Sequence, residues 1–177
     1  ACPSGVPYRD LISPFRALAT PKMNRSPLER LRRLFAAQTV PFPGRFRVAA
    51  MLGRIGRILP TPKALKPMLE LIPDVLPPKQ KWQGHYAAQG EKRARVALLL
   101  GCAQQVLDPD INTATIEVLT RNGVEVVIPR SQGCCGGLAW HTGDLEAARS
   151  FARQNLDAFS HDVEAILSNA AGCGSAM

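Results

Sequence analysis

From residue 95 to the end of the chain, short apolar runs alternate with amphipathic segments, and this alternation limits the possible folds more than any other feature. The runs 95–101, 124–129 and 163–172 are short and bounded by glycine or proline, which is typical of buried strands. The segments 108–123 and 143–159 between them have the apolar spacing of helices. Strand, helix, strand, helix, strand predicts an α/β domain built on a parallel sheet.

Both predicted helices have start and stop signals and one apolar side. Pro109 fits the start of the first, and Gly123 fits its end. Its expected buried face consists of Ile111, Thr115, Val118 and Leu119. The expected buried side of the second consists of Leu145, Ala148, Phe151, Ala152 and Leu156.

Residues 1–59 are expected to form helices that prolines interrupt. In 26–38, Ser26 can cap the N-terminus and Pro27 suits the first helical position. The apolar stripe of this helix is expected to consist of Leu28, Leu31, Leu34 and Phe35. A second amphipathic helix is expected over 44–59. Residues 60–94, rich in proline and charge, are predicted to be a linker with at most one short helix.

The five cysteines are Cys2, Cys102, Cys134, Cys135 and Cys173. The last four each follow a predicted strand, with 31 residues between Cys102 and the Cys134–Cys135 pair and 37 between that pair and Cys173. Because parallel strands end at the same edge of a sheet, where ligands bind in such folds, we expect these four thiols to meet.

Four converging thiolates predict a metal site, and two kinds of metal remain open. Structural zinc accepts four thiolates, but it usually takes short Cys-x-x-Cys pairs, and this chain has none. Glycines beside each of the four cysteines favour an iron–sulfur cluster, since backbone N–H groups near sulfur tune its potential. An odd cysteine count argues against a disulfide framework.

The sequence around these cysteines resembles that of a known family. LGCAQQVLDPDIN, VEVVIPRSQGCCGGLAWHTGDLEAAR and SNAAGCGSAM are similar to the cysteine-rich CCG domain of glycolate oxidase (glycolate dehydrogenase) iron–sulfur subunits. CPSGVPY at residues 2–8 is similar to the end of a bacterial ferredoxin motif, in which the last cysteine precedes proline. One departure is that no second cysteine follows Cys173 in a Cys-x-x-Cys.

The resemblance implies three parts: a remnant of a ferredoxin-like helical domain at 1–59, a linker at 60–94, and a first cysteine-rich CCG domain at 95–177 that is truncated at its end. It implies that Cys2, Cys102, Cys134, Cys135 and Cys173 bind iron–sulfur clusters, of the 4Fe-4S type. It also implies an electron-transfer subunit that accepts electrons from flavin-binding glycolate oxidase subunits and passes them towards a quinone. This chain alone holds no catalytic residue for the alcohol oxidation.

Two other functions remain open at this stage. One is a heterodisulfide-reductase-like catalyst that reduces a disulfide at the cysteine site, and the other is a non-redox interaction module with structural zinc. His141 follows the CCGG turn and could act as a ligand or proton relay, although a surface or capping role is favoured. Trp140 is expected to pack over the turn.

The charge of the chain suggests an acidic partner. Its net charge is +8, and the basic residues concentrate near the start on segments with amphipathic spacing. No nucleic-acid-binding motif is present, and no eighteen consecutive residues are apolar. We therefore expect a cytoplasmic protein without a nucleic-acid partner, with peripheral contact to the inner face of the cytoplasmic membrane.

Overall fold

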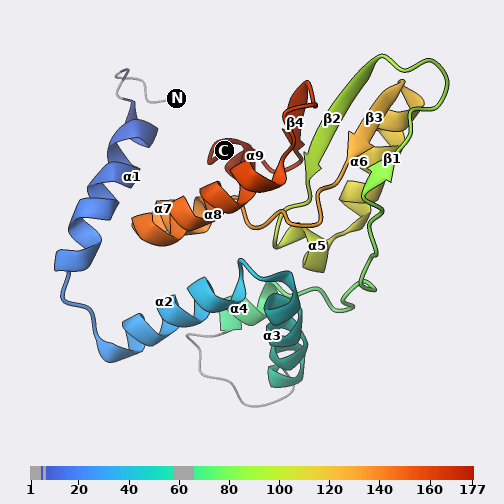
Figure 1. Cartoon of the computed structure of the whole chain (residues 1–177). Helices are drawn as coiled ribbons and strands as arrows, with labels where there is room; N and C mark the ends of the chain where they lie inside the picture. Colours follow the sequence, from blue (N-terminus) through green and yellow to red (C-terminus); the bar gives the residue numbers. More distant parts are fainter. Residues whose placement is uncertain (1–4, 6, 58–65) are drawn as a thin grey trace.

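The computed structural model describes residue 5, residues 7–57 and residues 66–177, and consists of an α/β layer flanked by N-terminal helices (Figure 1). The N-terminal elements are α1 (Tyr8–Ala19), the 3₁₀ helix η1 (Thr20–Lys22), α2 (Pro27–Thr39), α3 (Pro43–Gly56) and α4 (Lys66–Glu70). The α/β layer consists of β1 (His85–Tyr86), β2 (Ala94–Leu99), α5 (Gln104–Leu107), α6 (Asp110–Arg121), β3 (Val124–Val127), α7 (Gly137–Thr142), α8 (Leu145–Ala158), β4 (Ala165–Ser168) and α9 (Ala171–Gly174).

The sheet has the strand order β1-β3-β2-β4, with β2 in the centre of a parallel set. Strands β3 and β4 both run parallel to β2, in registers that pair Val96 with Val126 and Ala97 with Ile166. The chain passes from β2 to β3 on one side of β2, and then from β3 across to β4 on the other side. Such a reversal of direction opens a crevice at the carboxyl ends of the strands. The three strands and two long helices predicted from residue 95 onward are confirmed.

The two faces of β2 support two separate apolar clusters. Val96, Leu98 and Leu100 face α6 and meet Ile116 and Val126. The alternate residues Ala97 and Leu99 face the other way and meet Phe159 together with the cysteine side chains. The period of two along a strand thus places the cysteine site on the face of the sheet that does not carry α6.

Helix α6 does not bury the face that its apolar residues suggest. Its buried side chains are Asn112, Ile116 and Thr120, whereas Ile111 and Val118 are exposed. The prediction was wrong at these two positions because Asn112 finds a carbonyl acceptor at the end of β2, Leu100 O at 2.9 Å, which makes its burial favourable.

Helix α8 shows the same kind of difference. Phe151, predicted on the buried side, packs against the cysteine cluster. Ala152 and Leu156, predicted on the same side, are exposed, Leu156 by 73%. Its neighbour Asn155 is buried instead. Asp144 caps this helix by accepting a hydrogen bond from the Ala147 N–H at 3.1 Å, which explains where the helix begins.

The N-terminal helices form where the sequence predicts. Ser26 caps α2 by accepting a hydrogen bond from the N–H of Glu29 at 3.2 Å, and Pro27 occupies the first position. The apolar stripe of α2 is exposed, however, with Leu28, Leu31, Leu34 and Phe35 each 56–62% accessible. The predicted stripe therefore does not pack into a core within the described residues.

The segment predicted as a linker contributes more than a short helix. Besides α4, it supplies β1, which pairs antiparallel with β3 through His85–Val127 and Tyr86–Val126. Trp82 and Tyr86 also pack against the β2–β3–α6 cluster. Part of the expected linker is thus an integral edge of the sheet; residues 58–65 lie outside the described residues.

Candidate iron–sulfur site

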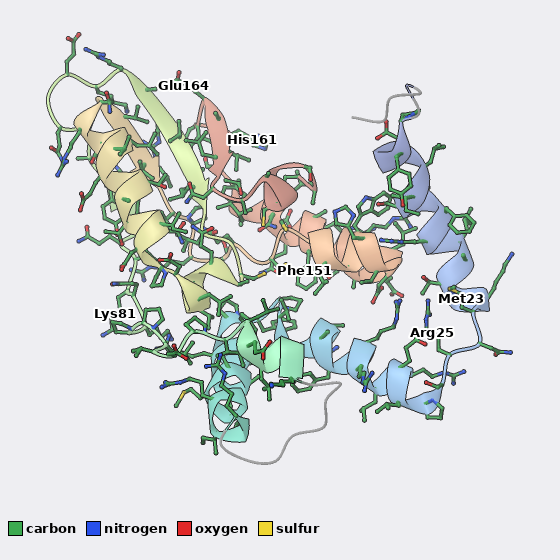
Figure 2. All side chains as sticks on the ribbon, turned by 180° about the vertical axis from the view of Figure 1, so that it is seen from behind. Met23, Arg25, Lys81, Phe151, His161 and Glu164 are labelled. Carbon is green, nitrogen blue, oxygen red and sulfur yellow. The ribbon has the colours of Figure 1, made fainter. Side chains whose placement is uncertain are left out.

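Three chain turns bring four cysteines to one end of the sheet. Cys102 follows β2, the Cys134–Cys135 pair lies between β3 and α7, and Cys173 lies in α9 just after β4. All four side chains join the cluster that contains Ala97, Leu99 and Phe159. Figure 2 shows sulfur atoms gathered between the sheet and helices α7 and α8. The sulfurs meet because the three parallel strands end at a common edge.

The sulfurs form a row in which each contacts the next. The Sγ atoms of Cys102 and Cys134 lie 3.5 Å apart. Cys135 is hydrogen-bonded to both Cys134 and Cys173, so the order along the row is Cys102, Cys134, Cys135, Cys173. All four are free thiols; Cys134 and Cys135 are buried, and the two end members are half-buried.

Backbone N–H groups point at the two central sulfurs. Gly136 N lies 3.5 Å from Cys134 Sγ, and Gly137 N lies 3.4 Å from Cys135 Sγ. Gly136 has φ +81° and sits against Ala148 of α8, so a side chain here would be strained and crowded. Such N–H groups favour negative charge on sulfur, whether carried by a thiolate or by a metal–thiolate group.

A set of buried amides holds the cysteine turns in place. Asn155 Oδ1 accepts from Gly133 N at 2.9 Å, and Asn155 Nδ2 donates to Cys134 O at 2.8 Å. Gln132 spans the end of β2, donating to Leu98 O at 3.1 Å and accepting from Leu100 N at 2.9 Å. The sequence analysis missed both residues, although a polar residue on an otherwise apolar helix face was a readable signal at Asn155.

Asn112 supports the opposite side of the same edge. Its Oδ1 accepts from Gln104 Nε2 at 3.1 Å and from Asn169 Nδ2 at 2.9 Å. Its own amide donates to Leu100 O, just before Cys102. This network ties the turn after β2 to the turn after β4, and so fixes the separation of the first and last cysteines.

The sulfur row alternates in its proton affinity. The hydrogen bond from Cys134 lowers the pKa of Cys102, and hydrogen bonds from Cys134 and Cys173 lower the pKa of Cys135. Hydrogen bonds with Cys102 and Cys135, aided by burial, raise the pKa of Cys134, and the bond with Cys135 raises that of Cys173. Sulfurs with a lowered pKa therefore alternate with sulfurs with a raised pKa, and binding a metal at all four requires the release of the protons that remain on them.

The donor set fits an iron–sulfur cluster by its chemistry. Cysteine thiolates are the ligands that such clusters take, and hydrogen bonds to sulfur tune their reduction potential. Four soft sulfur donors, with backbone N–H groups aimed at two of them, supply both features.

The other candidate residues lie elsewhere. Cys2 falls outside the described residues. His141 is exposed on α7, and its Nδ1 lies 3.2 Å from Ser13 Oγ of α1, so its described partner is a hydroxyl and not a sulfur. Trp140 is half-buried on the same helix.

A cavity of about 400 Å³ opens beside Cys135. Phe159, Val163 and Ile166 supply apolar walls, and the polar residues Ser160, His161 and Glu164 also line it. Figure 2 shows His161 and Glu164 on the segment that enters β4. The cavity thus lies against one of the two buried cysteines.

The family model described as a cysteine-rich domain, CCG, matches residues 96–177. The match spans the strands β2, β3 and β4 and all four clustered cysteines, which confirms the resemblance seen in the sequence. No solved structure matches the chain.

Curated proteins match beyond the CCG domain. The probable glycolate oxidase iron–sulfur subunit of Bacillus subtilis is 33% identical over 98% of this chain and 43% of its own length. The glycolate oxidase iron–sulfur subunit of Escherichia coli is 36% identical over 98% of this chain and 41% of its own. Lactate utilization protein A 2 of Bacillus cereus is 33% identical over 46% of this chain and 33% of its own. The chain thus spans about two fifths of the length of the first two relatives.

Proposed function

We propose that this chain is part of an iron–sulfur electron-transfer subunit of a glycolate, or other 2-hydroxy acid, dehydrogenase. The observation that carries the proposal is the row of four thiols at the carboxyl edge of a parallel sheet. The likeness to glycolate oxidase iron–sulfur subunits over nearly the whole chain supports it.

In this proposal, Cys102, Cys134, Cys135 and Cys173 hold a 4Fe-4S cluster, and Cys2 serves a second one. A bound cluster supplies one-electron transfer. The protein's part is to place the thiolates, to aim the N–H groups of Gly136 and Gly137 at sulfur, and to keep water from the buried pair. These N–H groups stabilise negative charge and so raise the reduction potential.

The proposal extends to partners and location. Flavin-binding glycolate oxidase subunits would supply the electrons, and a quinone would receive them. In this proposal the oxidation of the hydroxy acid takes place on the flavoprotein, because the four clustered cysteines would hold an electron carrier and the flavin would accept the hydride. The proposed location is the cytoplasm, at the inner face of the cytoplasmic membrane. Within the described residues, no helix has both the length and the apolar character of a membrane span.

A second candidate is suggested by the cavity beside Cys135. In this alternative the cysteine site itself reduces a disulfide, as in a heterodisulfide-reductase-like catalyst. Disulfide reduction by the purified subunit with an artificial electron donor, and no flavoprotein, would favour it. Absence of that activity in a protein whose iron is reduced normally would favour electron transfer.

Iron and sulfide analysis with EPR, on the full-length protein prepared without oxygen, tests the main proposal. Replacing Cys134 or Cys135 by Ser should abolish one EPR signal while the other remains. Ser175→Ala, an exposed change beside Cys173, is the matched control and should leave both signals intact. Folded protein without iron would refute the proposal, and zinc in its place would favour a structural zinc module.

A further inference from the structure

The net positive charge of this chain comes from its first third. Residues 1–57 contain eleven Lys and Arg and two Asp and Glu, a net charge of +9, whereas residues 58–177 contain eleven and twelve, a net charge of −1. The CCG domain therefore contributes nothing to the basic character of the chain. A partner drawn by charge would meet the N-terminal helices.

Helix α2 does not bury its apolar stripe. On its polar side, Arg33 reaches Thr142 O on α7 at 3.4 Å and Glu29 pairs with Arg25 at 3.1 Å, while Glu29 and Arg33 are themselves exposed. Its outer side consists of Leu28, Leu31, Leu34 and Phe35, all more than half exposed. With 3.6 residues per turn, this stripe covers about a third of the helix circumference.

Free cations border the stripe on both sides. Arg30 and Arg32 follow the helical repeat to opposite margins of the stripe. Lys22 lies in the turn before α2, next to exposed Met23, which Figure 2 labels. Within the described residues, none of these three cations has a side-chain hydrogen bond or ion pair, unlike Arg25 and Arg33. They are available to anionic groups outside the described chain.

We propose that α2 and the turn before it form a membrane-binding surface for an anionic lipid layer. The surface comprises Lys22, Met23, Leu28, Arg30, Leu31, Arg32, Leu34 and Phe35. Leu and Phe side chains enter the layer at headgroup level, while the flanking cations bind lipid phosphates, as in interfacial amphipathic helices. This inference rests on the proposed peripheral location and names the surface responsible for it.

A lipid layer fits this surface better than a protein core does. Burial of Arg30 and Arg32 in a protein interface would need acidic partners, because unpaired buried charges are strongly unfavourable. A membrane surface offers phosphates at the margins and hydrocarbon at the centre, which matches the order of residues around α2. The neighbouring helices also carry exposed apolar residues. These are Leu11, Phe15 and Leu18 on α1, and Val48, Met51, Leu52 and Ile55 on α3.

Flotation of the full-length protein with vesicles tests the proposal without any redox step. Binding is expected to vesicles that contain phosphatidylglycerol, to weaken with added NaCl, and to be absent from pure phosphatidylcholine. The double variant Arg30→Gln/Arg32→Gln should bind about 25-fold more weakly, at about fivefold per arginine. Arg149→Gln/Arg153→Gln, which removes two exposed charges from α8, is the matched control and should bind like the parent.

Phe35→Trp distinguishes insertion from simple charge attraction. Relative to the parent, its additional fluorescence should shift to the blue with anionic vesicles and be quenched by brominated lipid. If the rest of the protein covers α2, this signal is already blue-shifted and shielded before vesicles are added, and flotation fails. That result, or equal binding by the two double variants, would overturn the proposal, while an unchanged iron content would leave the proposed electron-transfer function standing.

Discussion

The side-chain amide of Asn155 bonds to the peptide groups on both sides of the Gly133–Cys134 link. It accepts from Gly133 N at 2.9 Å and donates to Cys134 O at 2.8 Å. One buried residue on α8 thereby fixes the turn that presents two of the four sulfurs. The placement of these sulfurs therefore depends on a residue that bonds to the backbone of the turn and not to sulfur.

Replacing Asn155 by Ala should therefore destabilise the protein and empty the site. Two buried peptide groups lose their partners, at about 1–3 kcal/mol each. Urea unfolding measures the free-energy change, and iron per polypeptide measures the site. Gln154→Ala, next in sequence, removes a hydrogen bond on the exposed side of the helix and should change the unfolding free energy by less than about 1 kcal/mol. Equal effects of the two changes would contradict this role of Asn155.

Gly143 determines how closely α1 approaches α7. Its φ is +85°, and an added Cβ would lie 2.5 Å from Arg16 O and 2.6 Å from Thr20 Oγ1. Gly143→Ala should lower the unfolding free energy by about 1–2 kcal/mol from the backbone alone, plus a term for the displaced helix. Gly90→Ala is the control, since Gly90 has φ +82° in open space and reports the backbone term alone. Protection of α1 amides from hydrogen exchange should fall only for Gly143→Ala.

The elements predicted correctly are those whose apolar residues recur at regular spacing and whose ends are marked by glycine or proline. The three parallel strands are short and bounded, and their common edge follows from handedness, so the meeting of Cys102, Cys134, Cys135 and Cys173 could be predicted from position alone. The strand β1 could not, because two residues in a charged, proline-rich stretch carry no period.

Buried amides account for the largest remaining difference. A pattern of apolar residues assigns Ile111 and Val118 to the core, whereas the chain buries Asn112 and Thr120. The reason is local: the carboxyl edge of the sheet leaves the Leu100 carbonyl without a strand partner, and an amide at the start of α6 reaches it. Sequence periodicity contains no information about such acceptors, so amides near strand ends are the residues most easily missed.

Asn112→Ala tests this account. The change removes a fully buried amide, leaves Leu100 O unpaired, and should lower the unfolding free energy by about 1–3 kcal/mol. Asn122→Ala, on the exposed end of the same helix, is the control and should have an effect of less than about 1 kcal/mol. A neutral Asn112→Ala would show that the network around Cys102 and Asn169 is not stabilising.

Glu125 of β3 makes stability depend on pH at the opposite end of the sheet from the cysteines. The carboxylate is buried among three basic groups: it contacts Lys92 and lies 2.8 Å from both His85 Nε2 and Arg95 Nη1. The Lys92 ammonium, followed by His85, holds the pKa of Glu125 below its usual value. A lowered folded-state pKa stabilises the protein above the unfolded-state pKa, and this stabilisation is lost as pH falls through the folded-state value.

Replacing Glu125 by Gln should therefore have its largest effect near neutral pH. The difference in unfolding free energy between parent and variant should shrink as pH falls from about 5, because the unfolded carboxyl titrates near 4.3 and the folded one below that. Urea unfolding at several pH values measures it. Glu117→Gln on exposed α6 provides the control, with a small difference that changes little over the same range. If the difference in unfolding free energy between the parent and Glu125→Gln instead grows as the pH falls, stabilisation by the ionised carboxylate is excluded.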